Sequence, residues 1–121
     1  MSGKQAKYSD LMSPMGIVGA VRLLEIKATN EGKINYEGAP IEDIKETVEK
    51  LGAEINEKEF KKAFRIAYDF GQLRITYDSE NKRRLYSIQN YPTHTNTIDS
   101  LLQLCGIIEI EPKKVKLKIE I

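Results

Sequence analysis

The feature that most constrains the fold is a change of hydrophobic period between residues 56 and 88. In residues 56–70 the apolar side chains recur at helical spacing, at Phe60, Ala63, Phe64, Ala67 and Phe70. After Gly71 the period becomes two, because Leu73, Ile75 and Tyr77 alternate with Arg74 and Thr76. Tyr86 and Ile88 can pair back across them. The stretch therefore predicts a helix followed by a β-hairpin, in a fold of the α+β class.

The helix expected at residues 56–70 has a marked start and two different sides. Asn56 is a good N-cap, and Glu59 stands three positions later, as in a capping box. At about 100° per residue, the side opposite the apolar stripe carries four cations: Lys58, Lys61, Lys62 and Arg65. We expect the stripe of Phe60, Phe64 and Phe70 to be buried, so these cations should face solvent.

The hairpin adds further cations and two tyrosines. Its turn and charged tip lie in "DSENKRR", residues 78–84, and its candidate cations are Arg74, Lys82, Arg83 and Arg84. Tyr77 and Tyr86 are expected to pack at the base of the hairpin with their hydroxyls exposed. Tyr68 flanks the basic side of the helix. Two roles stay open for it: packing within the protein, or stacking on the bases or sugars of a nucleic acid.

Two helices are expected before this stretch. The first is predicted to begin at Ser13-Pro14, to bury one side and to end near Gly32; its apolar positions are Ile17, Val18, Val21, Leu24 and Ala28. A short extended piece, residues 33–36, follows. The second helix spans residues 41–52 and places four acids on its outer side: Glu42, Asp43, Glu46 and Glu49.

The C-terminal part predicts a connector at residues 90–97, a short helix at 97–106 and a strand in "KVKLKIEI". That strand alternates strictly and needs a partner strand. Residues 98–121 lie outside the three-helix and hairpin part, and their apolar side chains are too many to lie in water: Leu101, Leu102, Leu104, Ile107 and Ile108. Two alternatives remain open, an extension of the core or a homodimer through residues 97–121.

Composition limits the class of protein. A chain of 121 residues has room for one domain, and 31% charged with 40% hydrophobic residues is typical of a globular protein. The net charge is +1, so any attraction to a polyanion must come from how the charge is distributed. Neither a hydrophobic signal core nor a membrane-length apolar run is found, and we expect a cytoplasmic protein. Abundant Ile, Lys and Glu without Trp is typical of heat-adapted proteins.

The order helix, short strand, helix, turn, helix and hairpin resembles the winged helix-turn-helix superfamily, from about Ser13 to Ile88. The resemblance implies a three-helix core with a hairpin wing at residues 13–90, preceded by a flexible arm at 1–12. A C-terminal helix and strand extension would occupy 91–121. It also implies that the third helix enters the DNA major groove while the wing contacts backbone or minor groove. The turn "LGAEIN" is roughly two residues longer than the tight turn of typical members, with Ile55 as its expected anchor.

The functional expectation is a non-catalytic protein that binds double-stranded DNA, a transcriptional regulator. Its DNA-binding residues would be Lys58, Lys61, Lys62, Arg65, Arg74, Lys82, Arg83 and Arg84. The alternative is a module for protein–protein interaction within a larger assembly, favoured by the acidic second helix and by the lack of Gln or Asn in the middle of the third.

No feature of the sequence predicts catalysis. His94 and Cys105, the single histidine and the single cysteine, are too few for a zinc site. A phosphate-binding loop and a nucleophile elbow are both missing from the sequence. We therefore expect no enzyme activity, no metal and no cofactor, with His94 at the surface and Cys105 as a small buried side chain.

Overall fold

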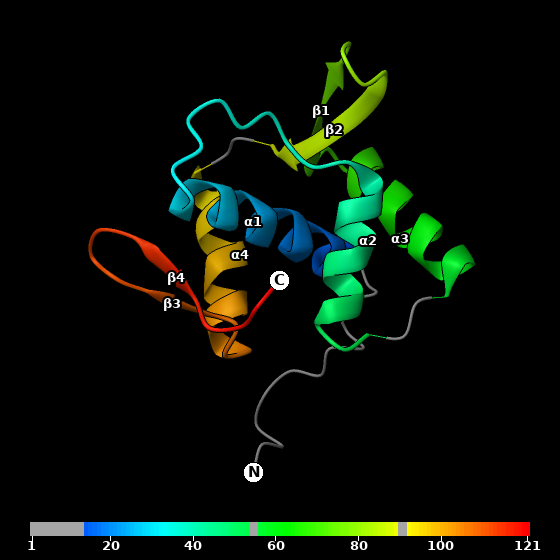
Figure 1. Ribbon diagram of the computed structural model, residues 1–121. Coiled ribbons are helices and arrows are strands. Elements are labelled where there is room, and N and C mark those ends of the chain that lie inside the picture. The colour runs from blue at the N-terminus through cyan, green and yellow to red at the C-terminus, as the bar shows by residue number, and fades with distance from the viewer. Residues whose placement is uncertain (1–13, 54–55, 90–91) are drawn as a thin grey trace.

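The computed structural model describes residues 14–53, 56–89 and 92–121 and shows an α+β fold (Figure 1). In these residues it has four helices and two antiparallel hairpins. The elements are α1 (Pro14–Asn30), α2 (Ile41–Lys50), α3 (Glu57–Asp69), β1 (Leu73–Asp78), β2 (Arg83–Ile88), α4 (Pro92–Leu104), β3 (Ile108–Ile110) and β4 (Val115–Leu117). The expected arm at 1–12, the Ser13 cap and the Ile55 anchor lie outside the described residues.

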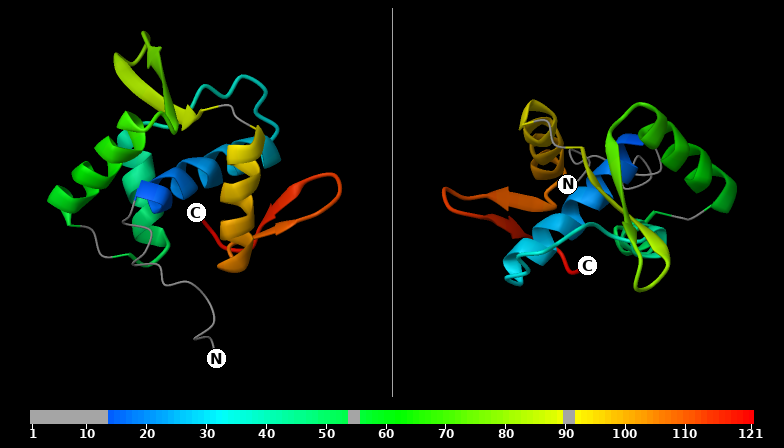
Figure 2. Two further views of the ribbon diagram at one scale, coloured as in Figure 1. Left: turned by 180° about the vertical axis from the view of Figure 1, so that it is seen from behind. Right: turned by 90° about the horizontal axis from the view of Figure 1, so that it is seen from above.

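Helix α1 is the centre of the core. Five of its side chains have no exposed surface: Ile17, Val18, Ala20, Val21 and Leu23. Helices α2 and α3 lie on one side of α1, and α4 with the C-terminal hairpin lies on the other (Figures 1 and 2). A helix covered on both sides needs apolar residues around most of its circumference. From the sequence we expected one buried side of α1, and burial of Ala20, Leu23 and Ile26 shows a second.

Helix α3 docks through aromatic and alanine side chains, as its sequence predicts. Asn56 caps the helix, and its side-chain oxygen accepts hydrogen bonds from the backbone N–H groups of Lys58 and Glu59 at 3.0 and 3.2 Å. Phe60 and Phe64 are buried. The prediction for Phe70 is wrong, because its side chain is 78% exposed. The helix ends at Asp69; Phe70 is its C-cap, and the chain reverses at Gly71, with φ at 72°, so no further helical turn packs beside the Phe70 ring.

The β1–β2 hairpin forms in the expected place, with Leu73 opposite Ile88 and Asp78 opposite Arg83. Tyr86 packs as predicted, with its ring edge-on to Phe64 of α3 at a centroid distance of 4.7 Å. The prediction of packing for Tyr77 is wrong, because the side chain is 61% exposed. Tyr77 lies next to the last pair of the hairpin, toward its tip, and is not among the residues that pack against the core.

A third extended segment pairs with the hairpin at Ala39 rather than at the expected residues 33–36. The N–H of Ala39 donates to the Tyr86 carbonyl at 2.9 Å, and the Tyr86 N–H donates back at 2.8 Å. Gly38 permits this approach: its φ is 131°, and a Cβ there would lie 2.6 Å from the Tyr86 oxygen. The glycine is therefore a requirement of the strand pairing.

The C-terminal part differs from expectation in two respects. Helix α4 begins at Pro92, so most of the expected connector at 90–97 is helical. The predicted strand in residues 114–121 is shorter, and its partner is Ile108–Ile110, which we did not assign to a strand from the sequence. Gly106, with φ at 73°, ends α4 and reverses the chain, which brings these two segments together. Ile98, Leu102, Ile107 and Ile108 join the core.

One ion pair connects α4 to α1. Arg22 donates from Nε and a terminal nitrogen to the two carboxylate oxygens of Asp99, at 2.8 and 3.0 Å, and also pairs with Glu25. Asp99 is buried. A bidentate guanidinium–carboxylate pair of this kind fixes both distance and orientation. It therefore sets how α4 lies on α1.

We predict that Asp99→Ala lowers the free energy of unfolding by about 3 kcal/mol, because it leaves a partly buried guanidinium without its bidentate partner. Urea denaturation monitored by circular dichroism measures the change. Asp69→Ala is the matched control, since Asp69 also pairs with an arginine, Arg65, but at an exposed site. Its expected effect is within about 0.5 kcal/mol of zero. Equal effects of the two substitutions would contradict the role of the Arg22–Asp99 pair.

Candidate nucleic-acid interface

The outer side of α3 is a basic surface. Lys58, Lys61, Lys62 and Arg65 are all exposed, on the side opposite the docked Phe60 and Phe64. Helix α3 lies at the edge of the molecule beside α2, and no described element covers its outer side (Figures 1 and 2). Arg65 has a side chain 83% exposed and a loose ion pair at 3.6 Å with Asp69. We call these four cations the α3 basic face.

One of the two acids beside Lys58 is engaged elsewhere. Glu57, in the first turn of α3, forms an ion pair with Lys45 of α2. The hydrogen bond from Lys45 lowers the pKa of Glu57, and the charge of Lys61 adds to the shift. Because Lys45 neutralises this carboxylate, it opposes an approaching anion less than an unpaired acid would.

The candidate cations of the β1–β2 hairpin divide between its two sides. Residues directly opposite in an antiparallel pair share a side of the sheet, and successive residues alternate. Arg74 and Asp78 are four residues apart on β1 and therefore share a side of the sheet. Arg83 stands opposite Asp78, so Arg74 and Arg83 lie on the same side. Arg84 stands opposite Tyr77 and lies on the other. The alternation was readable from the sequence, but the register that identifies the partners was not.

The hairpin tip is less basic than its "KRR" suggests. Asp78 accepts hydrogen bonds from Asn81 Nδ2 at 2.8 Å and from Arg83 Nε at 3.4 Å. The Asn81 hydrogen bonds, followed by the Arg83 guanidinium, hold the pKa of Asp78 below its usual value. Lys82 adopts a left-handed backbone with φ at 52°. One arginine of the tip is therefore engaged in its own turn, and the same turn also carries the acidic residue Glu80.

Three aromatic side chains near α3 and the hairpin are exposed: Tyr68, Phe70 and Tyr77. From the sequence, Tyr68 was left open and the other two were expected to be packed. Exposed aromatic rings beside arginines and lysines can pack on sugars or bases of a nucleic acid. Only the position of Tyr77, opposite Arg84, is tied by strand register to a particular cation.

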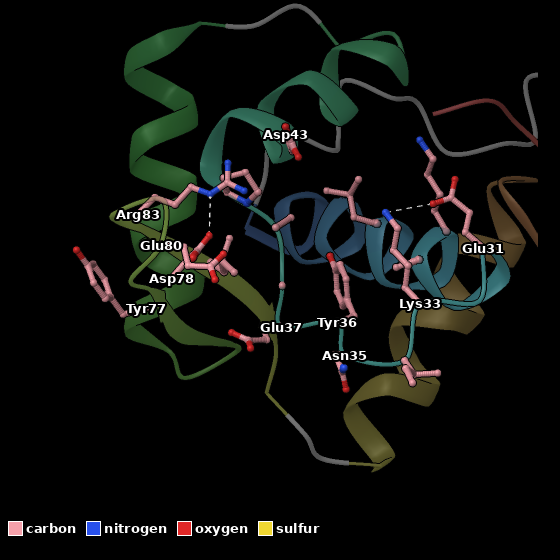
Figure 3. A pocket seen from close by; sticks show the side chains of 18 of the residues that line it. Glu31, Lys33, Asn35, Tyr36, Glu37, Asp43, Tyr77, Asp78, Glu80 and Arg83 are labelled. Carbon is pink, nitrogen blue, oxygen red and sulfur yellow. Dashed lines mark hydrogen bonds and ion pairs between the residues drawn. The ribbon is translucent and has the colours of Figure 1, made fainter.

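On its other side the hairpin borders an open groove of about 1000 Å³, shown in Figure 3. The groove lies between the hairpin, the end of α1 and residues 31–40. Its lining carries more acids than cations. The acids are Glu31, Glu37, Asp43, Asp78 and Glu80, and the cations are Lys27, Lys33 and Arg83. This concentration of carboxylates repels a polyanion. The acids of α2 were noted from the sequence, but the groove was not predicted.

Tyr36 lies in this groove with an unusual hydroxyl. The oxygen is buried and has no hydrogen-bond partner among the described residues. Burial, followed by the nearby charges of Glu25 and Asp43, raises the pKa of Tyr36 to about 12. All three effects disfavour the phenolate. The surroundings of Tyr36 therefore keep its hydroxyl neutral well above the ordinary tyrosine range.

Other kinds of site find little support in the described residues. They contain no group of three or more His, Cys, Asp or Glu side chains placed to hold a metal ion. Cys105 is partly buried against the core, and the backbone of His94 lies in α4 rather than in a connector. Within the described ranges, none of the helices has the length and apolar character that a bilayer crossing requires.

Comparison with models of protein families, with curated proteins and with solved structures found no match for this chain.

We predict that Tyr36→Phe changes the pH dependence of stability. In the wild type the folded chain holds the Tyr36 proton up to about pH 12, whereas an unperturbed tyrosine releases it near pH 10.0. The unfolded state therefore binds fewer protons in this window, and wild-type stability falls as pH rises through it. The variant does not show this fall. The amount by which its free energy of unfolding exceeds that of the wild type should therefore grow from about 1 kcal/mol or less at pH 7 toward pH 12.

Denaturant titrations between pH 7 and pH 12 measure this difference, and Tyr77→Phe, at an exposed position, is the matched control. A constant difference between wild type and Tyr36→Phe across the range would show that the hydroxyl is not disfavoured as a phenolate.

Proposed function

We propose that the protein is a winged-helix protein that binds double-stranded DNA without catalysis and acts as a transcriptional regulator. In this proposal α3 enters the major groove and the β1–β2 hairpin is the wing. The observation that carries it is the α3 basic face: Lys58, Lys61, Lys62 and Arg65 are exposed together because Phe60 and Phe64 dock the helix on its opposite side.

The order of elements supports the winged-helix part of the proposal. Helices α1, α2 and α3 are followed directly by a hairpin, and the segment at Ala39, between α1 and α2, pairs with β2 of that hairpin. This is the order of elements that the sequence resemblance implies. The hairpin is also held next to α3 through Tyr86 and Phe64, so groove helix and wing would approach one DNA duplex from the same molecule.

The lysine and arginine side chains of the α3 basic face support binding that depends mainly on contacts to DNA phosphates. The major groove is about 12 Å wide and admits a helix, and lysine and arginine contact phosphates and guanine edges there. Each phosphate neutralised releases counterions, so log affinity should fall with log salt by about 0.9 per contact. The lack of Gln or Asn between Lys58 and Arg65 favours contacts to phosphate over contacts to adenine.

A docking module for another protein is the second candidate function. It is favoured by the acidic groove beside residues 31–40, at whose edge Ile34 is 92% exposed. A homodimer remains part of the DNA-binding proposal, because Leu101, Leu104 and Ile110 stay exposed on α4 and β3. Such a dimer would present two α3 helices to half-sites roughly 34 Å apart.

The test of the proposed function replaces Lys61, Lys62 and Arg65 by alanine together. Binding of the variant to random-sequence duplex DNA at low salt should weaken by about tenfold or more, and its salt slope should fall by about 0.9 for each phosphate that the variant no longer neutralises. Thermal stability should stay nearly unchanged, because all three side chains are exposed. A fluorescence anisotropy titration at several salt concentrations measures both the affinity and the slope.

The matched control replaces Lys113, Lys114 and Lys116 by alanine. These lysines are also exposed, and they lie on the C-terminal hairpin, away from α3 (Figure 1). Their replacement changes the net charge of the protein by the same amount. The control variant should bind like the wild type apart from a small effect of net charge. Equal weakening by both triple variants would reject the α3 basic face, and undetectable binding by the wild type at low salt would favour the docking module.

A further inference from the structure

The β1–β2 hairpin separates two surfaces of different charge. Its Tyr86 side faces α3, because the Tyr86 ring lies edge-on to Phe64. Strand alternation places Arg84 and Tyr77 on this same side, two pairs further toward the tip. The opposite side carries Arg83, Asp78 and Leu85, which line the acidic groove; Tyr77 also borders the groove at its rim. Figure 3 shows Asp78 and Arg83 paired there, with the Tyr77 side chain projecting away from them.

We infer that the wing contacts the DNA backbone through Arg84 and Tyr77, on the side of the hairpin that faces α3, and not through Arg74 and Arg83. The inference rests on the proposed function and assigns its wing residues. From the sequence, Arg74, Arg83 and Arg84 were all candidate DNA-binding residues. The inference keeps Arg84 as a contact to the duplex and excludes the other two.

The assignment of Arg84 follows from position and from what surrounds it. It is exposed, and Tyr77, rather than an acid, stands opposite it. In the proposed complex the duplex contacts the α3 basic face and continues past the hairpin along its Tyr86 side. A guanidinium on that side can make a bidentate contact with one phosphate.

The exclusion of Arg83 and Arg74 has a different basis for each. Arg83 is held by Asp78 at 3.4 Å and faces the groove, where Glu37, Asp43 and Glu80 would repel a phosphate. Arg74 is exposed near the base of the hairpin, but its side chain leaves from the side that faces away from α3. A duplex on the α3 side is therefore out of reach of both arginines.

Tyr77 supplies the second contact. Its side chain is 61% exposed although it is large and partly apolar, and the strand register fixes it opposite Arg84. A tyrosine beside an arginine can pack its ring on a sugar and donate its hydroxyl to a phosphate. Because this contact carries no charge, it adds affinity without adding to the salt dependence.

The experiment compares Arg84→Ala with Arg74→Ala, two exposed arginines of one hairpin, in binding to the same random-sequence duplex over a range of salt. Arg84→Ala should lower the salt slope by about 0.9 and weaken low-salt binding, while Arg74→Ala should match the wild type in both. Tyr77→Ser should weaken binding with the slope unchanged. Thermal unfolding of the three variants checks that each is folded.

The outcomes separate this inference from the proposed function. If the wild type binds and the Lys61/Lys62/Arg65 variant is weakened, but Arg84→Ala and Arg74→Ala behave alike, the inference is wrong and the function stands. A change of the salt slope in Arg74→Ala alone would place the duplex on the groove side of the hairpin, and this result would also overturn the inference. An unchanged affinity of Tyr77→Ser removes Tyr77 from the contact. If the wild type does not bind duplex DNA, the proposed function and the inference both fail.

Discussion

The burial of α1 on two sides is the constraint on which the other elements depend. Ile17, Val18, Ala20, Val21 and Leu23 have no exposed surface, so α2 and α3 must cover one side and α4 with the C-terminal hairpin the other. The Arg22–Asp99 pair then fixes the orientation of α4, at the place where a purely apolar contact would leave it free to slide. The C-terminal residues are in this way part of the core that supports α3.

The functional surfaces follow from this arrangement. Helix α3 directs Phe60 and Phe64 to the core and to Tyr86, which leaves its cations outside and holds the hairpin beside it. Many of the acids lie elsewhere, on α2 and around the groove at residues 31–40. A chain with a net charge of only +1 thus presents one basic surface and one acidic groove, with the hairpin between them. This separation of charge favours a polyanion on the α3 side alone.

The elements that could be predicted from the sequence are those whose own residues determine them. The α3 cap at Asn56, the hairpin after Gly71 and the end of α1 near Gly32 all depend on local chemistry and are confirmed. Features set by distant segments were not predicted. Phe70 continues the helical period but follows the last helical residue, and β4 needed Ile108–Ile110, whose apolar run is equally compatible with a helix. The pairing of Arg83 with Asp78, five residues apart, required the geometry of the turn.

The outer side of α3 is, in our proposal, the surface that meets nucleic acid. Backbone amide chemical shifts, followed by NMR while a random-sequence DNA duplex is added at low salt, test it most directly. We expect the perturbed amides to gather on α3 around Lys58–Arg65 and on the hairpin around Arg84, with the C-terminal hairpin unaffected. Perturbations gathered around the acidic groove or on the C-terminal hairpin, or none at saturating DNA, would contradict the proposal.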